Sequence, residues 1–397
     1  MGHCGPDENG VQMNDPSPAR PSVVVVGGGY GGVTVAKQLD TVASVVLVEP
    51  KDAFLHNVAA LRALVDPAWL PRIYMPYDRL LSNGRVVQDR AAKVDIGRVM
   101  LASGEELAAD YVVLATGSRY PFPAKSDVDY AAVAQEKTRD FHAALAAANR
   151  VLLVGAGAVG LELAGEIKAV WPAKTVTLVD MADDVLDGQP GLFAPALRAE
   201  LRRQLHGLGV QLVLGSALRA APPTEPGKLG TFTVQTQAGA EVTADIWFSC
   251  HGVVPVSDYL TGGLAAARGS DGLIEVSPSL QVSGQSRVFA LGDVCTADRK
   301  VAHAAMTEAE VVAANIRALI EAGPGGEAEA VLRDYERMPP AIMVPIGPDN
   351  GSGQQPDSEE LWPPELVAEM KGRHMNVDLF AEFMGLPAGD RRDEPRH

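Results

Sequence analysis

Residues 23–32 read Val-Val-Val-Val-Gly-Gly-Gly-Tyr-Gly-Gly, a run of valines that leads straight into a glycine-rich turn. An uninterrupted apolar run is typical of a parallel strand that is covered on both faces. After the turn, residues 33–39 follow the spacing of a helix. We therefore predict a strand, a tight turn and a helix, and Gly27, Gly29 and Gly32 fit the GxGxxG pattern of that arrangement.

Such a unit suits the pyrophosphate of a dinucleotide. Its bare backbone N–H groups and the N-terminus of its helix favour negative charge. An acidic residue that holds a ribose hydroxyl is expected about 20 residues further on. Glu49 stands there, at the end of the apolar run 45–48. Residues 27–32 and Glu49 thus complete one dinucleotide half-site.

A second unit of the same kind begins at residue 151. It consists of the run Val151-Leu152-Leu153-Val154, the turn Gly155-Ala156-Gly157-Ala158-Val159-Gly160, a helix from Leu161, and a strand over 176–179 that ends on Asp180. A carboxylate at that position accepts both ribose hydroxyls of NADH and repels the extra phosphate of NADPH. Two units mean two dinucleotides or a duplicated fold, and an enzyme that stores hydride from a nicotinamide on a flavin needs such a pair.

Composition bounds the class of protein. The chain has 397 residues, enough for two or three domains. With 34 basic and 50 acidic side chains its formal charge is −16, so we expect no nucleic-acid partner. A transmembrane helix needs about 20 consecutive apolar residues, and the apolar runs here are short and strand-like. We predict no metal site in this chain.

The N-terminal residues and the cysteines indicate the compartment. Residues 1–20 are rich in Gly, Pro, Asp and Asn, and we predict a disordered tail without a signal-peptide core. Its start resembles a dual-acylation signal at Gly2 and Cys4, but Pro6 stands where Ser or Thr is required. The three cysteines are too scattered for a disulfide framework. We predict a cytoplasmic protein, with peripheral membrane contact left open.

Two more turns can approach a cofactor. The strand 111–114 runs into Thr116 and Gly117, where small residues let the backbone come close to a flat ring. The strand 287–291 ends on Gly292 and Asp293, and Asp293 either holds the ribityl or ribose of a flavin nucleotide or simply caps a helix. In the second unit, Glu162 and Glu166 share one helical face, where they serve the nucleotide site or complement the helix dipole.

Taken in order, these motifs resemble a known superfamily. The two fingerprints, the Ala115-Thr116-Gly117 turn and the Leu291-Gly292-Asp293 box resemble the flavoproteins of the pyridine nucleotide oxidoreductase superfamily. Within it, the stretches 56–62, 116–123 and 346–351 resemble the ferroptosis suppressor proteins, a group of apoptosis-inducing-factor-like flavoproteins that reduce quinones. The likeness runs from about Val23 to the C-terminal helix.

The resemblance implies the cofactors and their contacts. It implies FAD on Gly27, Gly28, Gly29, Tyr30 and Gly31, with Arg62, Val86 and Asp293 also in contact. It implies a nicotinamide dinucleotide on Gly155, Gly157 and Gly160, with Glu162 near the nicotinamide and the flavin. From residue physics alone, Arg62 is equally well a surface arginine. Pro6 and Asp180 depart from the group, so neither lipid attachment nor NADPH use is carried over.

Cysteine positions separate the possible acceptors. Disulfide reductases of this superfamily need a redox cysteine pair close after the first fingerprint, and residues 33–101 contain no cysteine. A sulfide:quinone-type enzyme needs a cysteine pair at the flavin, and only Cys250 and Cys295 could form it. We interpret these two residues as buried structural thiols, which disfavours that type of enzyme.

We therefore predict an α/β protein with two Rossmann-like dinucleotide-binding domains and a small C-terminal α+β domain. The FAD-binding domain comprises residues 21–122 and 253–322, the NAD(P)H-binding domain 123–252, and the C-terminal domain 323–397. The predicted function is an FAD-dependent NAD(P)H:quinone oxidoreductase that favours NADH. Glu162 would orient the nicotinamide, and protons would come from solvent or from His303.

Two other functions and two structural questions stay open. A reductase for a ferredoxin- or rubredoxin-type carrier shares both nucleotide domains, although the acidic charge disfavours docking of an acidic carrier. A flavin-switched interaction or signalling protein is a second alternative, and both monomer and homodimer are allowed. Finally, Trp362 with the pairs Leu379-Phe380 and Phe383-Met384 either faces a membrane or closes a core, and we favour the core.

Overall fold

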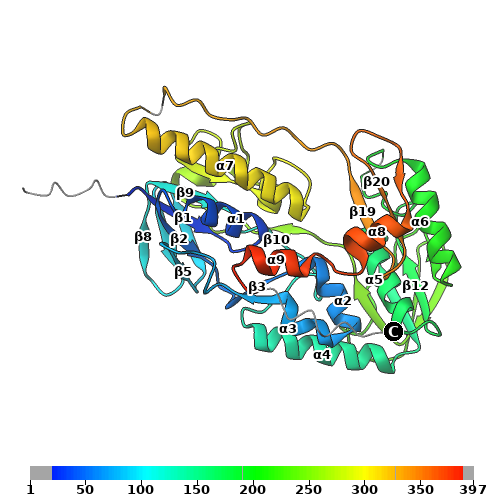
Figure 1. The fold of residues 1–397 in the computed structure, drawn as a ribbon. Helices are drawn as coiled ribbons and strands as arrows, with labels where there is room; N and C mark the ends of the chain where they lie inside the picture. The colour runs from blue at the N-terminus through cyan, green and yellow to red at the C-terminus, as the bar shows by residue number, and fades with distance from the viewer. Residues whose placement is uncertain (1–19, 190, 327, 388–397) are drawn as a thin grey trace, which may run out of the picture.

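Two separate parallel sheets carry the fold, as Figure 1 shows. The computed structural model describes residues 20–189, 191–326 and 328–387. The first sheet has the order β18-β9-β1-β2-β5, from Val288–Ala290, Tyr111–Leu114, Ser22–Val26, Ser44–Val48 and Arg85–Val87. The second has the order β13-β12-β11-β16, from Gln211–Val213, Thr175–Val179, Arg150–Val154 and Ile246–Ser249. The α/β prediction with two dinucleotide-binding sheets is confirmed.

Each sheet is covered by helices that follow its strands. On the first sheet α1 (Tyr30–Leu39) packs beside α7 (Ala302–Ala322), and on the second lie α5 (Ala158–Val170) and α6 (Pro195–Gly207). The helix α4 (Ala131–Ala147) leads into the second sheet, after a crossover that contains Pro121 and Pro123.

Small antiparallel units join and flank the two sheets. They are β3 (Ala53–Leu55) with β4 (Tyr74–Pro76), β6 (Ala91–Asp95) with β7 (Arg98–Leu101) and β8 (Glu106–Ala108), β10 (Ser118–Arg119) with β17 (Val254–Pro255), and β14 (Phe232–Gln235) with β15 (Glu241–Ala244). Short helical segments lie between them: η1 (Asn57–Ala59), α2 (Ala60–Val65), η2 (Pro67–Trp69), α3 (Leu70–Ile73), η3 (Gly262–Ala267) and η4 (Gly292–Val294).

The C-terminal segment divides between the two cores. Its strands β19 (Ile342–Pro345), β20 (Gly351–Gln354) and β21 (Leu361–Trp362) form a sheet, followed by α8 (Pro364–Val367), η5 (Ala368–Gly372) and α9 (Val377–Phe383). Val344 and Ile346 are buried in the core around α5 and α6. The chain then returns to the first sheet, where α9 lies close to α1 and β3 (Figure 1).

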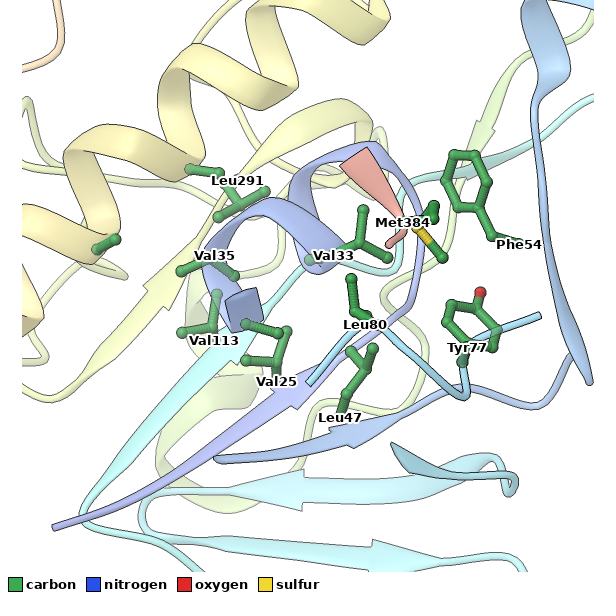
Figure 2. Close-up of a cluster of buried hydrophobic side chains, with 14 of the residues drawn as sticks. Val25, Val33, Val35, Leu47, Phe54, Tyr77, Leu80, Val113, Leu291 and Met384 are labelled. Atoms are coloured by element: carbon green, nitrogen blue, oxygen red, sulfur yellow. The ribbon is translucent and has the colours of Figure 1, made fainter. Parts of the chain in front are cut away.

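The core of the first unit forms where α1 meets its sheet. Figure 2 shows Val33 and Val35 of α1 facing Val25, Leu47 and Val113 of three strands. Val23, Val24, Val25 and Val26 are each at most 2% exposed, which explains the unbroken apolar run.

The C-terminal helix contributes to this same core. Met384 is fully buried and lies near Phe54 in Figure 2, and Phe380 is 7% exposed. The expectation that this apolar segment closes a core is confirmed for these two residues. It is wrong for Leu379, which is 67% exposed because it points away from the face of α9 that carries Phe380. Residues 1–19, with the predicted tail and Cys4, and residues 388–397 lie outside the described part of the chain.

Candidate functional site

The two glycine turns have nearly the same backbone geometry. Gly27 and Gly155, the first residues after β1 and β11, have φ values of +105° and +117°, which L side chains rarely adopt. A Cβ on Gly27 would collide with the carbonyl oxygen of Ala115, and one on Gly155 would lie 2.6 Å from that of Cys250. Glycine is therefore required at both positions, because a side chain would collide with the residue that follows the neighbouring strand.

The N-termini of α1 and α5 leave room for an anion. Gly29 and Gly157 are the N-cap residues, neither helix has a side-chain cap, and a Cβ on either glycine would meet no atom within 4 Å. The first N–H groups of both helices therefore face an open cradle, which a side chain would fill. The residues present thus fit the pyrophosphate of a dinucleotide at both turns.

Both predicted acids lie beside their own turn. Glu49 follows β2 and accepts a hydrogen bond from the N–H of Gly28 at 2.6 Å, and Asp180 follows β12 and accepts one from Ala156 at 2.5 Å. Gly28 and Ala156 are the second residues of their turns, so the two interactions correspond. Each carboxylate is fixed at the carboxyl end of its sheet, where a ribose of a bound dinucleotide lies. Their contact with ribose stays a prediction.

Val86 lies in β5 opposite Leu47 of β2, and β2 separates it from β1 and the first turn. Val87, which follows Val86 in the chain, accepts a hydrogen bond at its carbonyl from the backbone N–H of Glu49 at 3.0 Å. Val86 therefore lies on the edge strand that supports Glu49, within the part of the sheet where its predicted FAD contact would be made.

Tyr30 is held by a histidine that the sequence did not single out. The Tyr30 hydroxyl is 3.2 Å from Nδ1 of His56, whose Nε2 lies 2.6 Å from the carbonyl oxygen of Met375. Because a carbonyl only accepts, Nε2 carries the proton and Nδ1 accepts from Tyr30. Burial lowers the pKa of His56 to about 4, so the ring is neutral at pH 7. The Tyr30 ring also packs edge-on against Phe54 and Phe380.

The other two turns meet through polar side chains. Thr116 donates to the carbonyl of Val256 at 2.6 Å, and Gly117 has φ +65°. Asp293 accepts from Ser118 at 2.6 Å and pairs with Lys125 at 2.8 Å. Burial opposes ionisation of Asp293, but Lys125 and Ser118 outweigh it, so the pKa is lowered and the carboxylate is charged. Lys125 lies in the crossover, where a single lysine carries no sequence signal.

Arg62 and Glu162 each have a partner from another part of the chain. Arg62 is only 7% exposed, so its interpretation as a surface arginine is wrong. Its guanidinium binds both carboxylate oxygens of Glu166, at 2.5 and 2.8 Å, and the carbonyl of Gly372 at 2.8 Å. Glu162 pairs with Lys371 at 2.8 Å. The predicted contacts of Arg62 with FAD and of Glu162 with the nicotinamide stay predictions.

Two further acid–base groups lie on α7. His303 lies in the first turn of α7 and is exposed to solvent. Its predicted role as a proton donor stays a prediction. Glu308 is 1% exposed, and its carboxylate accepts from the N–H of Gly292 at 2.5 Å. Burial raises the pKa of Glu308 to about 7. The sequence assigns no role to Glu308, because its partner Gly292 is 16 positions earlier in the chain and outside α7.

The two described cysteines do not form a redox pair. Cys250 and Cys295 are free and buried, and they belong to different hydrophobic cores. Burial raises the pKa of each thiol to about 12. The interpretation as structural thiols is therefore supported over a sulfide:quinone-type pair. Across the described ranges, no helix is both long and apolar enough to cross a membrane.

Comparison with known proteins identifies a family and its relatives. The family described as pyridine nucleotide-disulphide oxidoreductase matches residues 21–309. The chain is 32% identical over 340 residues to ferroptosis suppressor protein 1 of Mus musculus, covering 84% of this chain and 88% of that protein. It is 30% identical over 348 residues to apoptosis-inducing factor homolog B of Dictyostelium discoideum, covering 84% and 89%. The resemblance inferred from the motifs is confirmed.

Solved structures share the fold at lower identity. An NAD-dependent persulfide reductase from A. fulgidus has a TM-score of 0.63 and 20% identity, over 84% of this chain and 63% of that chain. A ferredoxin reductase for the CYP199A2 system from Rhodopseudomonas palustris has a TM-score of 0.64 and 19% identity, over 84% and 82%. At these identities the likeness concerns the fold alone.

Proposed function

This chain belongs to the pyridine nucleotide-disulphide oxidoreductase family, and from that premise we propose that it oxidises NADH and passes two electrons through FAD to a quinone. The family makes it an FAD-dependent oxidoreductase that binds FAD and a nicotinamide dinucleotide. The proposal rests on the pair of matching turns. Each turn is an open cradle, and the N–H of its second residue donates a hydrogen bond to a carboxylate, Glu49 or Asp180. FAD supplies the chemistry that stores two electrons between donor and acceptor.

The choice of a quinone rests on the relatives and on the cysteines. The motifs at 56–62, 116–123 and 346–351 resemble those of the ferroptosis suppressor proteins, which reduce quinones. In the described residues, Cys250 and Cys295 lie in separate cores, so they offer no disulfide that could take electrons from the flavin. A diffusible acceptor is then the simplest partner for the reduced enzyme.

The preference for NADH rests on Asp180. Its carboxylate is fixed at the end of β12 by the N–H groups of Ala156 and Ala182, at 2.5 and 2.8 Å. A fixed negative charge at the ribose position accepts two hydroxyls and repels a 2′-phosphate. Glu162, one turn into α5, would orient the nicotinamide edge once the dinucleotide is seated.

Anaerobic stopped-flow of the purified yellow protein tests the proposal. We expect NADH to bleach the flavin band faster than NADPH, and a short-chain ubiquinone or menaquinone to restore it faster than an oxidised ferredoxin. Restoration only by the ferredoxin would establish the carrier-protein reductase instead. Slow restoration by every acceptor would favour the interaction protein, and absence of bound flavin would overturn the assignment of the first turn.

A further inference from the structure

We call the part of the chain built on the first sheet, with α1 and α2, the flavin half, and the part built on the second sheet, with α5 and α6, the nicotinamide half, after the cofactors proposed for their turns. The contact between α2 and α5 joins these two halves. On α2, Leu61, Leu64 and Val65 are each at most 5% exposed and belong to the same apolar core as Leu161 and Ile167 of α5. The contact includes Leu161, which lies in the first turn of α5, and α5 begins at Ala158 directly after Gly157 of the second turn. Any shift of α5 along α2 would therefore move the nicotinamide cradle relative to the flavin half.

One buried ion pair lies in this otherwise apolar contact. Arg62 of α2 and Glu166 of α5 are 7% and 2% exposed and form the two-pronged hydrogen bond described above. Such geometry is directional as well as strong, because the guanidinium fork fits the carboxylate in one plane. The pair therefore defines the position of α5 along α2, which apolar side chains alone define less sharply.

The C-terminal segment adds a third part to this junction. The Arg62 guanidinium also donates to the carbonyl of Gly372, and the adjacent Lys371 pairs with Glu162, one turn before Glu166 on α5. Both acids of that helical face are thus held by cations, one from α2 and one from η5. Beyond η5 the chain continues to α9 and the core around α1.

Energetic considerations separate positioning from stability. Removing an ion pair from water costs several kcal/mol, so a buried pair is weak evidence for stability, while a role in structural specificity is attested in some proteins. Burial raises the pKa of Glu166, opposed by the charge of Arg62. The apolar residues around the pair bury the contact between the helices without fixing a direction, and the directional ion pair adds a constraint on register.

We propose that Arg62 is a positioning residue that, with Glu166 and the Gly372 carbonyl, fixes the spacing between the two dinucleotide turns and so sets the rate of flavin reduction. This rests on the proposed function, because it concerns hydride transfer from NADH. It assigns Arg62 to the junction between the halves and not to a phosphate of FAD.

The test uses Arg62→Lys and the double variant Arg62→Met with Glu166→Met. Lysine keeps the charge but loses the fork, and the double variant replaces the pair by apolar side chains of similar size, which keeps the fold. We expect both to retain FAD at the wild-type ratio of flavin to protein. At saturating NADH, flavin reduction should slow by about 10-fold in the first and about 100-fold in the second, since misplacement by about 1 Å has such effects.

Arg72→Lys is the matched control. Arg72 and Arg62 both lie over the ring of Trp69, at 4.8 and 5.2 Å, but Arg72 is exposed and pairs with Asp378 on the surface. We expect wild-type reduction in this variant. Loss of FAD from Arg62→Lys would overturn the proposal in favour of a phosphate contact, as would an unchanged reduction rate in the double variant. If NADH fails to reduce the wild-type flavin, the proposed function fails separately.

Discussion

The two turns start alike and then differ in what surrounds them. After Gly29 comes Tyr30, which is enclosed by Phe54, His56 and Phe380, whereas the corresponding residue after Gly157 is Ala158. The first turn is thus packed by the C-terminal helix, and the second has only a methyl group at the same place. The difference suits the proposed assignment, in which the first turn retains FAD through every turnover and the second binds and releases a nicotinamide dinucleotide.

The largest effect should come from Gly27→Ala and Gly155→Ala, which test the two turns in parallel. Each puts a side chain at a positive φ and against a backbone carbonyl. We expect the first variant to purify without flavin. The second should stay yellow but need more than about 100-fold more NADH, since every contact with the pyrophosphate shifts. Flavin absorbance and NADH titration measure both outcomes. Equal loss of flavin from both variants would contradict the assignment of the turns.

Phe380→Ala should weaken the first half selectively. Truncation of a buried phenylalanine costs about 3–5 kcal/mol, and this ring also stacks on Phe54 at 5.2 Å between ring centres. We expect a lower melting temperature, faster loss of FAD on dilution and an unchanged dissociation constant for NADH. Leu379→Ala, at a 67% exposed neighbour, is the control and should stay within about 0.5 kcal/mol of wild type. Wild-type FAD retention in Phe380→Ala would separate α9 from the flavin turn.

The raised pKa of Glu308 predicts that the free energy of unfolding of the flavin half depends on pH. Because burial raises its pKa from 4.5 to about 7, the folded protein binds the extra proton between these values. Its contribution therefore lowers stability as pH rises from about 4.5 to 7, by up to about 3 kcal/mol. Glu308→Gln should flatten this part of the curve of unfolding free energy against pH. An identical curve for the variant would show that Glu308 ionises normally in the fold.

The smallest effect is expected for coenzyme choice. Asp180→Asn removes the charge but keeps an oxygen that can accept from Ala156, so the turn should persist. We expect the preference for NADH over NADPH to fall by about 10-fold, near 1.4 kcal/mol, in flavin reduction. Glu49→Gln makes the same change in the other half and should leave this ratio alone. A shift in both variants would mean that the two acids do not serve separate dinucleotides.

Local features of the chain were predictable because their causes are local. Gly27 and Gly155 follow from the need for a positive φ after a buried strand, and the unbroken runs of valine and leucine follow from strands covered on both faces. The positions of Glu49 and Asp180 were predictable because each comes directly after the strand that pairs with the strand leading into its turn. The fold class could therefore be derived before any contact was known.

Tertiary structure alone decided the partners of the charged and aromatic residues. Arg62 meets Glu166 across 104 positions in sequence and Gly372 across 310, and His56 meets Met375 across 319. No periodicity carries such pairings, because they depend on how two independently packed sheets and a returning C-terminal segment are placed together. The same holds for Leu379 and Phe380, adjacent apolar residues that helical geometry sends to opposite environments. Sequence determined the two cradles, and long-range packing determined what holds them in place.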